Sequence, residues 1–177
     1  MAAIEKGRMT HAYDGELVVF LIGMRINSWW RPDLWLPVFT AMPPMLAELS
    51  ADPDSGMLGY RLLLGEGGPM LVTYWDSHQK LYAYASRPDA KHRPAWTRFN
   101  QRARRVPGAV GIWHETFQVS RAESVYVGMP VSGLAKATSA VPVGPRGQRA
   151  TERYHAGGTS LAACPSRAAT NTAMLQR

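Results

Sequence analysis

Hydrophobic residues follow two different periods along the first 130 residues, which predicts both strands and helices. Residues 16–26 form an unbroken aliphatic and β-branched run, typical of a central strand that is covered on at least one face. Residues 34–49 instead place apolar side chains three or four positions apart, as in a helix. Pro43 and Pro44 must break or kink that helix, because neither can donate an N–H. Two further runs, 57–64 and 70–75, flank a glycine-rich segment and predict a β-hairpin.

The region after the hairpin predicts a helix in two pieces and a last strand. Asp76 or Ser77 can cap the first piece, and the second covers about 92–105 after an interruption at Arg87-Pro88-Asp89. Residues 110–119 alternate as a strand does. One face of this strand is expected to carry Ile112, His114, Thr116 and Gln118, and the other Trp113, Glu115, Phe117 and Val119.

The resulting order, β-α-β-β-α-β, is the ferredoxin-like arrangement, so we expect an α+β fold with a four-stranded antiparallel sheet and helices on one face. Such a sheet leaves its other face bare. Packing two copies face to face into a homodimer would cover it, and the many large aromatic residues favour this. We place this domain at residues 10–130. Residues 131–177 contain one aromatic residue, Tyr154, and are expected to be an extended, partly disordered basic tail.

Composition narrows the class of protein. A content of 46% hydrophobic and 19% charged residues excludes wholesale disorder. The longest apolar run, 17–24, is too short to span a bilayer, and no secretory signal precedes it. The single cysteine, Cys164, excludes multi-cysteine zinc sites and cysteine-held iron–sulfur clusters. We therefore expect a cytoplasmic protein with no membrane partner.

The net charge of +7 is concentrated at one end of the chain. Residues 131–177 hold six basic residues and one acidic residue, whereas residues 1–130 hold 14 basic and 12 acidic residues. Nucleic-acid recognition usually needs a basic face on the folded domain itself, so no nucleic-acid partner is expected.

Several common catalytic motifs are absent from the sequence. There is no G-x-x-x-x-G-K-[ST] phosphate loop and no G-x-S-x-G nucleophile turn. The five histidines show no zinc-binding spacing, so no metal site is expected.

Two stretches carry a resemblance to a known superfamily: TYWDSHQKLYAYASRPDAKH, residues 73–92, and GIWHETFQV, residues 111–119. A strand that ends in an aromatic residue, then a serine, a helix of aromatic residues and a histidine is its recurring pattern. The chain resembles the dimeric α/β-barrel superfamily, and within it a monooxygenase-like family akin to the antibiotic-biosynthesis monooxygenases. The positions that match are Trp75, Ser77, Leu81, Tyr84 and His92.

The resemblance implies one of two chemistries. Some relatives oxygenate polycyclic phenols or similar natural-product intermediates without metal or flavin, and we expect this activity here, on an aromatic, polyketide or terpenoid substrate. Other relatives bind haem on a helix histidine, and aldoxime dehydratases pair such a histidine with a strand histidine. The alternatives are therefore a haem-binding protein, either aldoxime-dehydratase-like or a haem carrier, and a non-catalytic binder of hydrophobic ligands.

The candidate catalytic residues are His114 and His92. His114 lies in mid-strand among mixed neighbours, where imidazole can exchange protons near neutral pH; the plainer alternative is a hydrogen-bonded core histidine. His92 could line the site or bind haem iron, or simply face solvent in the first turn of its helix. The expected substrate-binding residues are Asn27, Trp75, Tyr84, Trp96 and Trp113. Aromatic residues at such spacings also serve as ordinary core.

Overall fold

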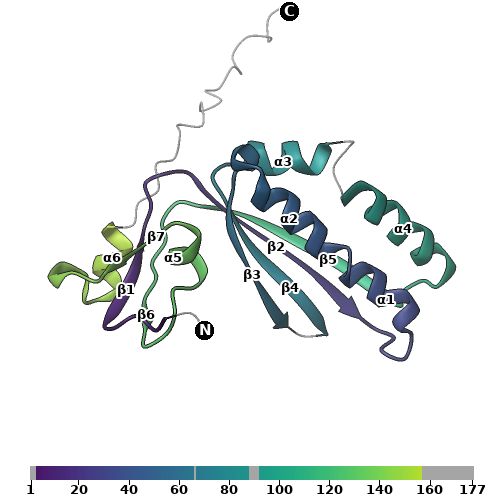
Figure 1. Ribbon diagram of the computed structural model, residues 1–177, viewed down its shortest axis with the longest axis horizontal. Coiled ribbons are helices and arrows are strands. Elements are labelled where there is room, and N and C mark those ends of the chain that lie inside the picture. Colours follow the sequence, from purple (N-terminus) through teal and green to yellow (C-terminus); the bar gives the residue numbers. More distant parts are fainter. Residues whose placement is uncertain (1–2, 66, 88–91, 157–177) are drawn as a thin grey trace, which may run out of the picture.

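The computed structural model describes residues 3–65, 67–87 and 92–156 and contains two antiparallel sheets (Figure 1). The larger sheet has four strands in the order β3-β4-β2-β5: β2 (Leu17–Ile26), β3 (Met57–Gly65), β4 (Gly68–Trp75) and β5 (Val110–Val119). When β2, β3, β4 and β5 are counted as the first to fourth strands of this sheet, their spatial order is 2-3-1-4. This order is the ferredoxin-like topology. The predicted fold class is therefore confirmed.

The first helical region is divided in two. Helix α1 (Pro32–Phe39) ends where the amide of Thr40 donates to the carbonyl of Leu36, and α2 (Met42–Ala51) begins two residues later. Pro43 and Pro44 lie in the first turn of α2, where a missing N–H costs little because the amides of a first turn have no acceptor within their own helix. The predicted break is confirmed, and the two prolines start a helix rather than kink one.

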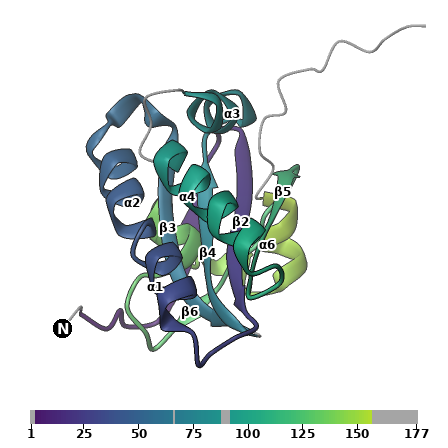
Figure 2. The ribbon, with the colours of Figure 1, turned by 90° about the vertical axis from the view of Figure 1, so that its right-hand side faces the viewer.

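The second helical region is also divided, as expected. Helix α3 (His78–Ser86) is capped by Ser77, whose hydroxyl accepts from the amide of Lys80. Helix α4 (His92–Arg105) follows the undescribed residues 88–91 and leads into β5. Helices α1, α2, α3 and α4 lie over the same face of the larger sheet (Figure 2).

The layer between helices and sheet is closed at one end by a compact apolar cluster. Val18 of β2, Leu49 of α2, Trp75 of β4 and Leu81 of α3 are all buried in it, and Phe20, Met57 and Tyr84 pack against it. Since β2 is the second strand from one edge and is paired on both sides, its even-numbered side chains form the floor of this layer.

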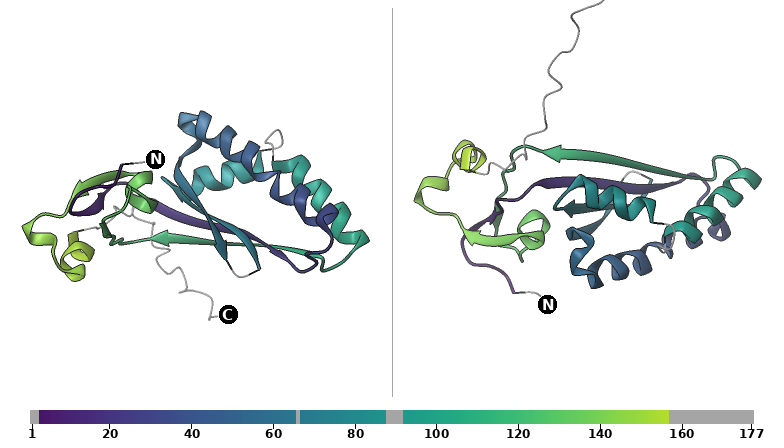
Figure 3. Two further views of the ribbon diagram at one scale, coloured as in Figure 1. Left: turned by 60° about the horizontal axis from the view of Figure 1, so that its bottom comes forward. Right: turned by 90° about the horizontal axis from the view of Figure 1, so that it is seen from above.

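The opposite face of the sheet is only partly covered. At one end Leu17, Val72 and Tyr74 pack against Leu134 of the short helix α5 (Gly133–Ala137). Further along, Phe117 is 49% exposed. Figure 3 shows no helix over this part of the sheet. The structure therefore leaves a sheet surface open to solvent, as the topology predicts, and this surface carries apolar side chains together with Glu115.

A second, three-stranded sheet lies beside the first. Its order is β6-β1-β7, with β1 (Arg8–Ala12) paired to both β6 (Tyr126–Val127) and β7 (Ser139–Pro142). A 3-10 turn (Pro145–Gly147) and helix α6 (Ala150–Ala156) complete it. The buried guanidinium of Arg153 fastens α6 through an ion pair with Glu123 and hydrogen bonds to the carbonyls of Gly147 and Gln148.

This second sheet was not predicted from the sequence. Residues 133–156 were expected to be extended, and instead they form α5, β7, the 3-10 turn and α6. The reason is that β7 is only four residues long and finds its partner β1 more than 120 positions earlier, as in the pair Met9 and Pro142. Residues 157–177 lie outside the described part of the chain. Within that described part, no helix is long and apolar enough to cross a membrane.

Candidate functional site

His114 lies in the middle of β5 with its side chain on the helix-covered face of the sheet. The antiparallel register pairs it with Ile22, and its neighbour along the strand face, Thr116, pairs with Phe20. The imidazole ring is 5.7 Å from the phenyl ring of Phe20, centroid to centroid, at a tilt of 39°. The predicted division of β5 into two faces is therefore correct for His114. Its side chain is exposed, so a bound molecule could reach it.

Trp75 forms the inner wall of the same layer. Its side chain is 2% exposed, and its indole N–H donates to the hydroxyl of Thr73 at 2.8 Å. That hydroxyl in turn donates to the backbone carbonyl of Phe20 at 3.0 Å. The chain of hydrogen bonds satisfies the indole inside the core and links the wall to the strand that carries Phe20.

Tyr84 connects this wall to the helices. Its ring is 6.3 Å from that of Trp75, and its hydroxyl donates to Oε2 of Glu48 on α2 at 3.5 Å. Burial, with the charge and the hydrogen bond of Glu48 as smaller causes, raises the pKa of Tyr84 to about 12. The phenol is therefore neutral across the physiological range and acts as a hydrogen-bond donor.

Trp113 lies on the other side of the sheet. It pairs with Gly23 of β2, and its indole covers that glycine so closely that a Cβ there would lie 2.6 Å from the ring. The structure therefore does not bring Trp113 together with His114. Its side chain belongs to the partly open sheet face.

Asn27 and Trp96 lie away from the wall formed by Trp75 and Tyr84. The amide of Asn27 donates to the carbonyl of Gly108 at 2.8 Å, and its oxygen accepts from Arg25. The bond to Gly108 ties the end of β2 to the segment just before β5. Trp96 is half-exposed on α4 and stacks on Phe99 with a centroid distance of 5.5 Å. Neither contact is to His114.

His92 is the first residue of α4, but its side chain is outside the described residues. The structure therefore does not test its expected role. Where α4 meets α1 and the start of β5, the layer is closely packed. The cavity among Leu34, Phe99 and Val110 measures only about 10 Å³, about the size of one water, so this part of the layer does not fit a haem as it stands.

No metal centre is visible in the part of the chain that the structure describes, where no three His, Cys, Asp or Glu side chains gather closely enough to hold an ion.

Three residues of this layer were not singled out from the sequence: Phe20, Glu48 and Thr73. Phe20 was one of many apolar residues in its strand, and Thr73 shows its importance only through its two hydrogen bonds. Glu48 offered a usable signal, because it is the sole charged residue in the apolar segment 42–51. A lone carboxylate on such a helix usually has a polar partner, here Tyr84.

Of three similar solved structures, the first supports this fold. An aldoxime dehydratase, OxdRE, solved with butyraldoxime, superposes with a TM-score of 0.51 at 16% identity, over 64% of this chain and 34% of that one. The cofactor-independent oxygenase SnoaB from Streptomyces nogalater gives a TM-score of 0.37 at 13% identity, over 59% and 93% of the two chains. A dimeric ferredoxin-like protein of unknown function from Bacteroides fragilis gives 0.38 at 14%, over 57% and 96%.

The sequence itself identifies the family. No curated protein is similar enough in sequence to be matched. Residues 17–134, which begin with β2 and end in α5, do match the sequence model of one family, and this span covers more than half of the chain. The protein therefore belongs to the Monooxygenase af470-like family.

Proposed function

We propose that the protein is a monooxygenase that acts on a hydrophobic, aromatic or terpenoid small molecule without a bound cofactor, with His114 as its acid–base residue. The observation that carries this proposal is the placement of an exposed imidazole beside Phe20, on the sheet face that also holds Trp75, against which Tyr84 of α3 packs. Aromatic walls suit a flat substrate, and one titratable group fixed on a strand suits proton transfer.

The chemistry follows from an electron-rich substrate. His114 removes one proton from the substrate, either from the activated CH₂ carbon or from the hydroxyl of its phenol or enol form, and the resulting enolate transfers electrons to dioxygen. A C–O bond forms at that carbon, which now carries one hydrogen, and the peroxide anion takes the proton back from His114 to give a hydroperoxide. Loss of water then cleaves the O–O bond and leaves a carbonyl. One oxygen atom enters the product and the other leaves as water, so the substrate supplies all the electrons.

Tyr84 supports this reaction as a neutral donor. Its raised pKa keeps the phenol protonated, so it can hydrogen-bond to a developing oxyanion on the substrate. Glu48 holds the hydroxyl in place in the absence of substrate. His92, Asn27 and Trp96 are further proposed contacts at the edges of the same layer. Trp113 would contribute only from the opposite face.

We also propose that the protein is a homodimer that buries the open face of the larger sheet. Phe117 and Trp113 expose 49% and 37% of their surface there, beside the apolar side chains of Val19 and Leu21, and Glu115 is the charged residue between them on this strand face. Apolar patches of this kind mark interfaces in soluble proteins. In a dimer with a two-fold axis, this patch on one copy would contact the same patch on the other copy.

The test is oxygen consumption by the purified protein with a panel of polycyclic phenols and no added metal, flavin or haem. The proposal expects consumption of one dioxygen per substrate and, with ¹⁸O₂, a product that carries one labelled oxygen. Binding of a phenol without turnover would instead make the protein a non-catalytic ligand carrier. A hemin titration serves as the control, since a Soret band together with activity only after hemin addition would contradict the cofactor-free reaction.

A further inference from the structure

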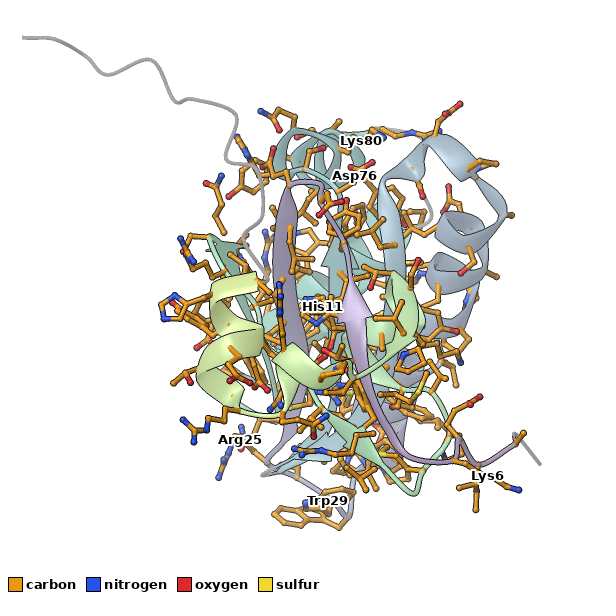
Figure 4. All side chains as sticks on the ribbon, turned by 90° about the vertical axis from the view of Figure 1, so that its left-hand side faces the viewer. Lys6, His11, Arg25, Trp29, Asp76 and Lys80 are labelled. Atoms are coloured by element: carbon orange, nitrogen blue, oxygen red, sulfur yellow. The ribbon has the colours of Figure 1, made fainter. Side chains whose placement is uncertain are left out.

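Helix α1 carries an apolar ridge that faces solvent. Four apolar residues at steps of three and four, Trp29, Pro32, Leu36 and Phe39, are all exposed, and Trp30 beside them is 77% exposed. Helix α1 is apolar on its inner side as well, through Leu34 and Val38, whereas a surface helix usually carries polar residues on its outer face. Figure 4 shows Trp29 protruding at the lower end of the molecule, beyond the strands.

The ridge carries almost no charge of its own. Asp33 is the one charged residue within α1, and Arg31 neutralises it through two hydrogen bonds of 2.9 and 2.7 Å. The indole N–H of Trp35 donates to the carbonyl of Trp29, which fixes the turn that presents both tryptophans. The ridge is therefore a built surface rather than a loose loop.

A basic group lies directly beside this ridge. The last turn of α4 carries Arg102, Arg104 and Arg105. The backbone amides of Asn27 and Ser28 both donate to the carbonyl of Ala109, which ties the tryptophan turn to the segment that follows α4. Figure 1 also places the end of α4 next to α1. Among the described residues, no ion pair involves Arg104 or Arg105.

From this juxtaposition we propose that the tryptophan–arginine tip, defined as Trp29, Trp30, Leu36, Phe39, Arg104 and Arg105, docks on the surface of an anionic lipid bilayer. Tryptophan prefers the boundary between headgroups and acyl chains, and arginine is attracted to negative headgroups. An acidic protein or a nucleic acid would match the arginines but would leave the apolar ridge unexplained. This is peripheral docking without a spanning helix, and it departs from the sequence-based expectation of no membrane partner. It does not rest on the proposed reaction.

The test is co-sedimentation of the full chain with vesicles of phosphatidylcholine alone or mixed with phosphatidylglycerol. We expect binding to the mixed vesicles that weakens as salt rises. Trp30→Ser should weaken it about tenfold, equivalent to about 1.4 kcal/mol of buried side chain. The double variant Arg104→Gln/Arg105→Gln should weaken binding about 30-fold, because each arginine near an anionic surface contributes about 1 kcal/mol.

The matched controls lie at the opposite end of the molecule. Tyr154→Ser removes an exposed aromatic residue, and Arg146→Gln/Arg149→Gln removes two exposed arginines. Both should keep the affinity of the parent protein within about twofold. Absence of vesicle binding, or equal loss in the tip and control variants, would overturn the proposal. So would a change of oligomeric state in Trp30→Ser, measured by light scattering, because a second copy would then be the occupant of the tip.

Discussion

His114 and Phe20 meet across two paired strands, with their rings 5.7 Å apart on the helix-covered face of the sheet. The residue directly before His114 in the chain, Trp113, covers Gly23 on the opposite face. A one-residue shift in the pairing of β5 would exchange the two side chains and place the indole under the helices. The register of β5 on β2 therefore decides whether an imidazole or an indole faces the helices.

Thr73→Val should destabilise the fold by about 1–3 kcal/mol, because it leaves the indole N–H of the buried Trp75 without an acceptor. Urea unfolding followed by circular dichroism measures this loss. Thr73→Ser keeps the hydroxyl and is the control, with a smaller expected loss. Equal losses for valine and serine would mean that the methyl group, not the hydrogen bond, matters.

Tyr84 should lose its hydroxyl proton only at high pH. Since its pKa in the folded protein is about 12 and that of an ordinary tyrosine is about 10, the folded state favours the neutral phenol. This contribution to stability is complete below about pH 10 and is lost as pH rises toward 12. In a pH titration, the absorbance near 295 nm should show one tyrosine that ionises near pH 12, and this step should be absent in Tyr84→Phe. Glu48→Gln should lower its pKa, since the nearby charge is removed while burial remains.

The second sheet should lose stability in acid through His11. Burial lowers the pKa of His11, although the charge of Glu123 opposes this, and Nδ1 lies 2.8 Å from the hydroxyl of Ser124. The unfolded chain therefore takes up this proton first, and protons favour unfolding as pH falls below about 6.5. Melting temperatures should decline less steeply with pH in His11→Gln than in the parent. Identical slopes for His11→Gln and the parent protein would contradict this assignment.

Phe117→Lys should convert the proposed dimer into a monomer. The substitution replaces an apolar ring on the open sheet face by a charge, which would cost several kcal/mol to bury against a second copy. Light scattering of the purified protein measures the mass. Gln118→Lys adds the same charge one residue later on the opposite face and should leave the dimer intact. A parent protein that is already monomeric would refute the dimer directly.

The larger sheet could be predicted almost residue by residue, because the signals that specify it are local. The alternation of residues 110–119 matches β5, and the proline pair marks the start of α2. The second sheet depends instead on pairing between distant short segments, such as Thr10 with Val141. No local period reports that kind of pairing.

The arrangement of the candidate site residues could be predicted in part for the same reason. His114, Trp75 and Tyr84 were each visible as a residue type at a position on a strand or helix. Their shared environment depends on Glu48 and Phe20, which belong to other elements and are brought in only by packing. The alternation of residues 110–119 already separated Trp113 from His114, but it could not tell which of the two faces the helices cover.

The most direct measurement of the central claim is the turnover rate of His114→Ala on a phenol that the parent protein oxygenates. The account predicts a fall of about 10²–10⁴-fold with an unchanged melting temperature, since the side chain is exposed and acts in proton transfer. Gln118→Ala, on the same face of the same strand, should keep the parent rate. A His114→Ala rate within about twofold of the parent would contradict the account, because the oxygenation would then proceed without the residue on which it depends.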